Sequence, residues 1–215
     1  MACVLTVALV RDGTVTIGHV GDTRLYALSG GAISKVTRDH SPVGTREDQG
    51  EIDEFEAMHH PRRNEIYRDV GSERHDPGDA EFIDTFERPF GEADALVLCT
   101  DGLSDMIPSA EIARIVGEHA SDPPRAVERL IEAANRAGGN DNVTAVLVAG
   151  PRFAEEAERR ARGTTPWGQF AARAAGLGRT LRAALVSRPA LFADGLLAGL
   201  ALASASARLR GLEEQ

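Results

Sequence analysis

The sequence is poor in cysteine and has no excess of positive charge. Its two cysteines, Cys3 and Cys99, lie far apart and form no C-x-x-C pair, which argues against a zinc site and against a disulfide framework. Acidic residues outnumber lysine and arginine by 33 to 24, giving a net charge of −9. Because a protein that neutralises phosphates needs a basic surface, this balance argues against nucleic-acid binding. The acidity suits a cytoplasmic protein or a cation site.

The sequence also lacks a clear targeting or membrane segment. Its first apolar run, residues 3–10, has no basic residue before it and no small-residue cleavage pattern after it, so it is a poor signal peptide. A second apolar stretch, residues 189–207, is long enough for a membrane span but contains Asp194 and several serines and glycines. We favour an alanine-rich packing helix there and expect no membrane association.

Strands separated by tight turns dominate the first 37 residues. The alternating segments 4–10 and 14–20 flank Asp12-Gly13, a tight-turn dipeptide, and predict a β-hairpin. Further strands are expected at 24–28, 32–37, 80–87, 94–100 and 142–148. Short strands joined by tight turns pair in antiparallel fashion, so we expect antiparallel sheets.

Helical periodicity appears only after the sheet-forming segments. Apolar residues at i, i+3 and i+4 spacing predict helices near 109–119, with Ser109 as N-cap, and near 123–136. The polar segment 38–80 contains one expected short helix, at 50–58. Beyond Pro151 the composition shifts towards alanine and arginine, so we expect a domain over 1–150 and a helical tail over 151–215. The fold class is α+β, with no βαβ alternation.

Acidic residues mark the ends of several predicted strands. Asp101 directly follows the strand at 94–100, and Asp141 directly precedes the strand at 142–148. Glycine lies near both acids and lets the backbone turn sharply. Asp22, also after a strand and a glycine, is a third such acid. Neighbouring strands would bring these carboxylates together, and oxygen ligands without a His or Cys cluster select Mg²⁺ or Mn²⁺. The alternative is that each aspartate merely caps a turn.

Five segments in this order resemble the bacterial metal-dependent protein phosphatases of the type 2C (PPM) class: HVGDTRLYAL, KVTRDHSPV, HHPRRNEIYRDVG, LVLCTDGLSDM and GGNDNVTAVLV. The resemblance covers about residues 4–149. It implies a β-sandwich of two antiparallel sheets flanked by helices. It also implies hydrolysis of phosphoserine and phosphothreonine in proteins by a water activated between two Mn²⁺ or Mg²⁺ ions.

The resemblance also assigns roles to individual residues. Asp101 and Asp141 match two ligands of one catalytic metal, while Asp22 matches an acid that helps to hold a third, weaker metal. The segment 41–75 matches a flap beside the active site. The resemblance places the three arginines of this segment near phosphate or an acidic peptide, although ordinary surface arginines are the commoner explanation. They are Arg62, Arg63 and Arg68. The histidines expected to be structural are His40, His59 and His60.

The chain departs from the family pattern at its start. Members begin with an R-x-x-N-E-D-like strand and a D-G-x-G-G motif whose aspartate bridges both metals, and this sequence contains neither. We therefore expect an N-terminally truncated member and assign no catalytic residue. One reading is a serine/threonine phosphatase, opposing a bacterial serine/threonine kinase, whose full gene product is active. The alternative is a catalytically dead module that binds a phosphoprotein or a kinase. A regulatory phosphatase acting on an anti-sigma antagonist fits the flap less well.

Overall fold

The computed structural model describes residues 2–76, 79 and 81–164. By its internal contacts the chain divides into two units, Met1–Ala161 and Arg162–Gln215, and the domain described below is the first. The apolar stretch 189–207 lies outside the described residues, as does most of the expected tail. No helix in the described part is long and apolar enough to cross a membrane.

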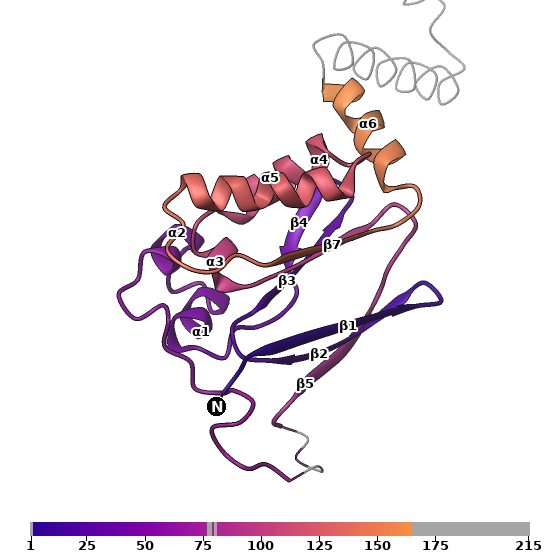
Figure 1. Cartoon of the computed structure of the whole chain (residues 1–215). Helices are drawn as coiled ribbons and strands as arrows, with labels where there is room; N and C mark the ends of the chain where they lie inside the picture. Colours follow the sequence, from indigo (N-terminus) through magenta and orange to yellow (C-terminus); the bar gives the residue numbers. More distant parts are fainter. Residues whose placement is uncertain (1, 77–78, 80, 165–215) are drawn as a thin grey trace, which may run out of the picture. The chain divides into compact units, whose positions relative to one another are not determined.

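Two antiparallel sheets form the centre of the domain (Figure 1). The three-stranded sheet has the order β1-β2-β5, with β1 at Leu5–Arg11, β2 at Thr14–Val20 and β5 at Asp84–Pro89. The four-stranded sheet has the order β4-β3-β6-β7, with β4 at Ala32–Lys35, β3 at Arg24–Ser29, β6 at Ala95–Cys99 and β7 at Ala145–Ala149. All strand pairs are antiparallel.

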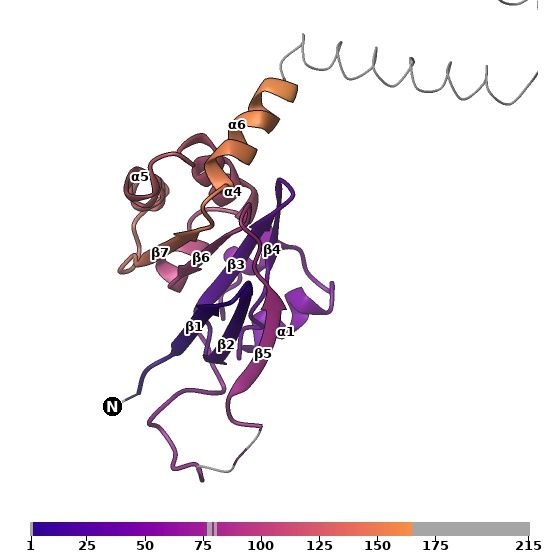
Figure 2. The same cartoon turned by 90° about the vertical axis from the view of Figure 1, so that its right-hand side faces the viewer.

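The part of the chain that the structure describes contains six helices: α1 (Pro42–Asp48), α2 (Glu54–Met58), α3 (Asp101–Ser104), α4 (Ser109–Glu118), α5 (Pro123–Arg136) and α6 (Phe153–Thr164). The two views show α4 and α5 on the face of the four-stranded sheet that is turned away from β1, β2 and β5 (Figures 1 and 2). Helices α1 and α2 lie together at one end, in the polar segment between β4 and β5.

Side-chain alternation along the strands divides the core into two parts. On β3, Leu25 and Ala27 pack with Val15 and Ile17 of β2 between the two sheets. Tyr26 and Leu28 point the other way and pack with the residues of α4 and α5. Burial of apolar surface on both faces of the four-stranded sheet is the main stabilising contribution. The predicted sandwich with flanking helices is confirmed for the described residues.

Local predictions agree with the structure at the hairpin and differ at three other points. Asp12 and Gly13 form the β1–β2 turn with φ values of 50° and 74°, as their residue types predict. The strand expected at 80–87 instead spans Asp84–Pro89, and α1 was not predicted. Ser109 is the first residue of α4 and Pro108 its N-cap, because the Glu54 carboxylate takes over the capping interaction through Ser109.

Candidate functional site

The ends of β6 and β7 are joined beyond their last ladder pair. Cys99 pairs with Ala145, and the next residue along, Thr100, donates its backbone N–H to the Thr144 carbonyl at 3.1 Å. The Thr100 hydroxyl donates to the Asn142 carbonyl at 3.1 Å and accepts from the Thr144 N–H at 3.1 Å. The two segments that carry Asp101 and Asp141 are therefore held side by side, as the strand pattern predicted.

Asp22 reaches the same region from the loop between β2 and β3. It lines a small cavity together with Asp39, Asp101, Asp105, Arg24 and Arg63. Burial raises the pKa of Asp22 to about 6, and the negative charges of Asp101 and Asp39 add to this effect. The raised carboxyl pKa therefore comes first from burial, and the neighbouring carboxylates increase it.

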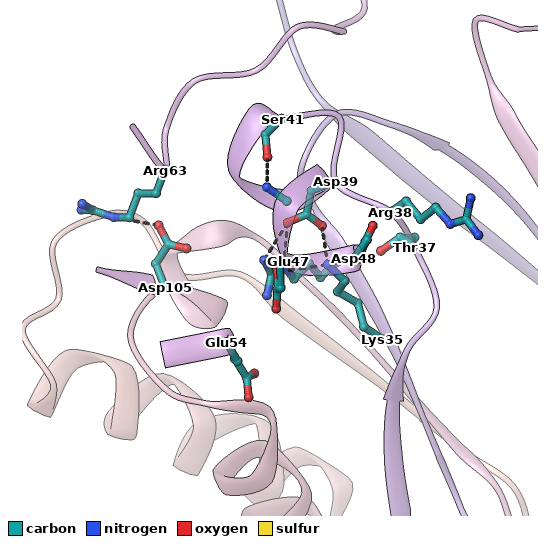
Figure 3. Close-up of polar contacts among 12 residues, drawn as sticks. Lys35, Thr37, Arg38, Asp39, Ser41, Glu47, Asp48, Glu54, Arg63 and Asp105 are labelled. Carbon is teal, nitrogen blue, oxygen red and sulfur yellow. Dashed lines mark hydrogen bonds and ion pairs between the residues drawn. The ribbon is translucent and has the colours of Figure 1, made fainter. Parts of the chain in front are cut away.

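Asp105 is a member of this cluster that the sequence analysis missed. It is the residue after α3, four positions beyond Asp101, so the two side chains lie on the same face of the helical turn. Burial, followed by the charge of Asp101, raises the pKa of Asp105 to about 6. Its Oδ2 accepts from the Arg63 Nε at 3.0 Å (Figure 3). The spacing D-x-x-x-D at the start of a helix was the signal that could have identified it.

Asp101 lines two cavities, as do Asp105 and Arg63. The first is the one it shares with Asp22 and Asp105, and the second is lined by Asp101, Asp105, Asp141, Asn140 and Arg63. Asp141 is exposed, and its Oδ1 accepts from the Asn142 N–H at 2.6 Å. The four carboxylates offer only oxygen donors, which suit Mg²⁺ or Mn²⁺.

The charge balance of the site fits a cation, although its geometry is incomplete. Burial is the main cause of the raised pKa of Asp22 and of Asp105, and the charge of Asp101 raises both further. A bound cation would offset that repulsion. Within the described ranges, no three Asp, Glu, His or Cys side chains are arranged closely enough to enclose a metal ion. The donor set thus fits a divalent ion, and further ligands would have to complete its coordination.

The three arginines of the predicted flap lie in different places. Arg63 lines both cavities around Asp101. Arg62 is exposed and pairs with Glu65 at 2.6 Å, whereas Arg68 pairs with Asp84 at 2.9 Å. Only Arg63 therefore faces the acidic cluster. Of the histidines expected to be structural, His40 is buried. His59 and His60 contact backbone atoms of the segment 41–75, which we call the insert.

A buried network of ion pairs borders the cavity that Asp22 lines. Arg24, on β3, donates to Asp39 Oδ2 from Nε at 2.9 Å and from Nη2 at 2.7 Å. It also pairs with Glu47 of α1 at 2.8 Å, and Glu47 pairs with Lys35 at 3.1 Å. Figure 3 shows Lys35, Glu47 and Asp48 around Asp39. The network fastens α1 to the strands next to the Asp22 loop.

Comparison with known proteins identifies close relatives. The chain is 39% identical over 148 residues to the serine/threonine phosphatase stp of Listeria innocua, covering 69% of this chain and 56% of that protein. It is 34% identical over 156 residues to the protein phosphatase PhpP of Streptococcus pneumoniae, covering 69% and 58%. The chain thus spans a little over half the length of the curated relatives it matches. No family model matches it.

Solved structures give the same result for the fold. The crystal structure of the serine/threonine phosphatase PstP/Ppp of Mycobacterium tuberculosis superposes with a TM-score of 0.59 at 32% identity, covering 68% of this chain and 60% of that chain. A structure of the PstP catalytic domain in complex with two manganese ions superposes with a TM-score of 0.55 at 32% identity, covering 68% and 57%.

Proposed function

We propose a function from the following premise: this chain belongs to the family of bacterial PPM-type serine/threonine phosphatases. The protein would remove phosphate from phosphoserine or phosphothreonine in phosphorylated proteins of the cytoplasm, opposing a serine/threonine kinase. The observation that supports this most directly is the carboxylate cluster around Asp101, where Asp22 and Asp105 carry a raised pKa. A related phosphatase has been solved with two manganese ions.

The described residues would act mainly by holding charge in place. Asp101 and Asp105, which line both cavities, would contribute to cation binding in each, with Asp22 in the first cavity and Asp141 in the second. Mn²⁺ or Mg²⁺ bound there would lower the pKa of a water molecule and neutralise phosphoryl oxygens. Arg63 could donate to a phosphate oxygen, because its guanidinium carries donors beyond the one that Asp105 accepts.

The missing motif sets the expected level of activity. In the family pattern the aspartate of D-G-x-G-G bridges the metals, and this sequence lacks that motif. We therefore expect full activity only when a segment carrying such an aspartate is present. No contact among the described residues favours the alternative of a module that only binds a phosphoprotein.

The test measures hydrolysis of a phosphothreonine peptide by this chain with and without Mn²⁺. The site variant is Asp101→Asn/Asp141→Asn, and the matched control is Asp12→Asn in the distant β1–β2 turn. Turnover that needs Mn²⁺, survives in the control and is lost in the site variant supports the proposal. If folded protein shows no turnover, the measurement is repeated with a D-G-x-G-G segment from a relative fused at the N-terminus. Continued inactivity there, or turnover unaffected by the site variant, contradicts the proposed site.

A further inference from the structure

His40 lies between the Asp22 loop and the polar insert, and only 3% of its surface is exposed. Its backbone N–H donates to the Gly21 carbonyl at 2.7 Å. Its ring Nδ1 accepts from the Gly21 N–H at 3.0 Å. One residue therefore satisfies both backbone polar groups of Gly21, the residue directly before Asp22.

Gly21 has little freedom to move from this position. Its φ of 108° lies in a region that favours glycine. A Cβ at Gly21 would overlap the side chain of Val4, so the backbone here is closely packed on a second side. The direction in which the chain leaves Gly21 determines where the Asp22 carboxylate lies. The two hydrogen bonds from His40 to the Gly21 backbone are thus the main polar contacts that fix the path of the chain into Asp22.

The opposite side of the His40 ring is anchored as well. Its Nε2 lies 3.2 Å from Asp84 Oδ2 on β5, and its backbone carbonyl accepts from the Tyr67 N–H at 2.9 Å. Because Nδ1 accepts from Gly21, the proton of the neutral ring must be on Nε2, where it faces the Asp84 carboxylate. Arg68 Nη1 lies 3.1 Å from the same nitrogen and pairs with Asp84, so it acts on the ring through that carboxylate. When a carboxylate holds one ring nitrogen of a histidine, the tautomer and the orientation of the ring are fixed, and so is the position of the other nitrogen.

We propose that His40 is a positioning residue for the Asp22 carboxylate. It sets the Asp22 loop through Nδ1 and the backbone, while Asp84 and the insert hold His40 itself. It touches neither a cation nor a substrate. The inference rests on the proposed function only in taking Asp22 as part of a cation site. The competing explanation is that His40 merely fills space at the end of the sandwich.

Two substitutions distinguish these explanations, because each places a polar atom where only one of the two ring nitrogens of His40 lies. In His40→Asn the side-chain oxygen can take the place of Nδ1 and accept from Gly21, but the contact with Asp84 is lost. In His40→Gln the amide can reach Asp84, but the acceptor for Gly21 is lost. His119→Asn, at the end of α4, is the control. The readouts are the Mn²⁺ dissociation constant from calorimetry, the exchange rate of the Gly21 amide from NMR, and the melting temperature.

We expect His40→Gln to weaken Mn²⁺ binding by about tenfold or more, as loss of a supporting contact around a metal ligand does, and to speed exchange of the Gly21 amide. His40→Asn should stay close to the wild type in both. Equal losses in both variants, equal retention in both, or a loss confined to His40→Asn would each overturn the proposal.

Failure of the cation site can be told apart from failure of this inference. If neither the wild-type chain nor its fusion with the D-G-x-G-G segment binds Mn²⁺, the cation assignment fails, and exchange of the Gly21 amide alone decides the role of His40. If His40→Gln does not fold, His40→Leu takes its place, because it also fills the site but offers no acceptor to the Gly21 N–H. Faster Gly21 exchange in His40→Leu would then support the positioning role, and unchanged exchange would contradict it.

Discussion

The backbone of Gly102 lies directly against the carbonyl of Asn142, so closely that a Cβ at Gly102 would overlap it. These two residues follow Asp101 and Asp141 in the chain. Their contact lets the start of α3 and the start of the β7 segment approach each other. The glycine after Asp101 is therefore required by packing and not by its φ angle.

Gly102→Ala should push the two acidic segments apart. We expect a loss of about 1–3 kcal/mol in the free energy of unfolding, which is typical of overpacking, together with weaker Mn²⁺ binding. Gly117→Ala is a matched control, because a Cβ there meets no atom within 4 Å. Denaturant unfolding and calorimetry measure both effects. Equal stability of the two variants would show that the loop adjusts without cost.

The raised pKa values at the site predict a pH dependence of stability. Asp22 has a pKa of about 6 in the folded protein against an ordinary value of 3.8, so the folded state binds more protons between these values. Its contribution to the free energy of unfolding is present below pH 3.8 and is lost as the pH rises through about 6. Asp22→Asn should therefore stabilise the metal-free protein at pH 7.5, by about 1 kcal/mol after allowing for solvent screening.

The same substitution has the opposite effect when a cation is present. Mn²⁺ should stabilise the wild type at pH 7.5 more than it stabilises Asp22→Asn, because the variant lacks one negative ligand. Melting temperatures at pH 5 and pH 7.5, with and without Mn²⁺, give all four comparisons. A wild type and variant with parallel pH profiles would contradict the role of Asp22 in this charge cluster.

Much of the sheet and most helices could be predicted from the sequence because their signals are local. The Asp12-Gly13 turn and the apolar periodicity of α4 and α5 depend on a few adjacent residues. Helix α1 has a local start signal, Ser41 as N-cap followed by Pro42, but no apolar periodicity. Of its apolar or small residues only Val43 and Gly44 are buried, and contacts from Arg24 and Lys35 to Glu47 hold it in place. Those contacts depend on tertiary structure.

The acidic residues of the site divide in the same way. Asp101 and Asp141 could be placed side by side from the sequence because antiparallel neighbours bring the end of one strand to the start of the next. Asp105 had only the D-x-x-x-D spacing as a signal, and Asp39 had none, because its relevance comes from burial and from the charges around it. Similarly, sequence alone could not choose among Arg62, Arg63 and Arg68. They differ in the acidic residue that each one pairs with, and the folded structure alone determines these partners.

Arg63 and Arg62 form a natural pair for testing the phosphate contact. Arg63→Ala removes the guanidinium that lowers the pKa of Asp105, so that pKa should rise further. It should also weaken binding of a phosphothreonine peptide in the presence of Mn²⁺ by about tenfold, the value of one charge-assisted hydrogen bond. Arg62→Ala, which only frees exposed Glu65, should change neither. NMR titration and calorimetry are the measurements, and equal behaviour of the two variants would remove Arg63 from the site.

Glu54 joins the insert to α4 and should stabilise both. Its Oε1 accepts from the Ser109 N–H at 2.7 Å and its Oε2 from the Ser109 hydroxyl at 2.9 Å. We expect Glu54→Ala to cost about 1–2 kcal/mol, as the loss of a helix cap does. A double-mutant cycle with Ser109→Ala should give a coupling of about 1 kcal/mol for the hydroxyl bond. Additive effects would show that the hydroxyl contact contributes nothing.

Asp39 combines a structural and an electrostatic role. It accepts two hydrogen bonds from buried Arg24 on Oδ2, while its Oδ1 accepts none from the described residues. Asp39→Asn would leave Arg24 with Glu47 as its remaining close anion, and breaking a buried pair in this way should cost about 3 kcal/mol. Asp48→Asn, which touches Lys35 in a more exposed position, should cost less than about 1 kcal/mol.

The same variant also tests how far the ion network acts on the site. The charge of Asp39 contributes to the raised pKa of Asp22, so Asp39→Asn should lower the pKa of Asp22, whereas Asp48→Asn should leave it in place. NMR titration of the Asp22 carboxyl measures this directly. A destabilised variant with an unchanged Asp22 pKa would mean that the network supports the fold alone. A lowered pKa would mean that the ion network also sets the pH at which Asp22 ionises and so becomes able to bind a cation.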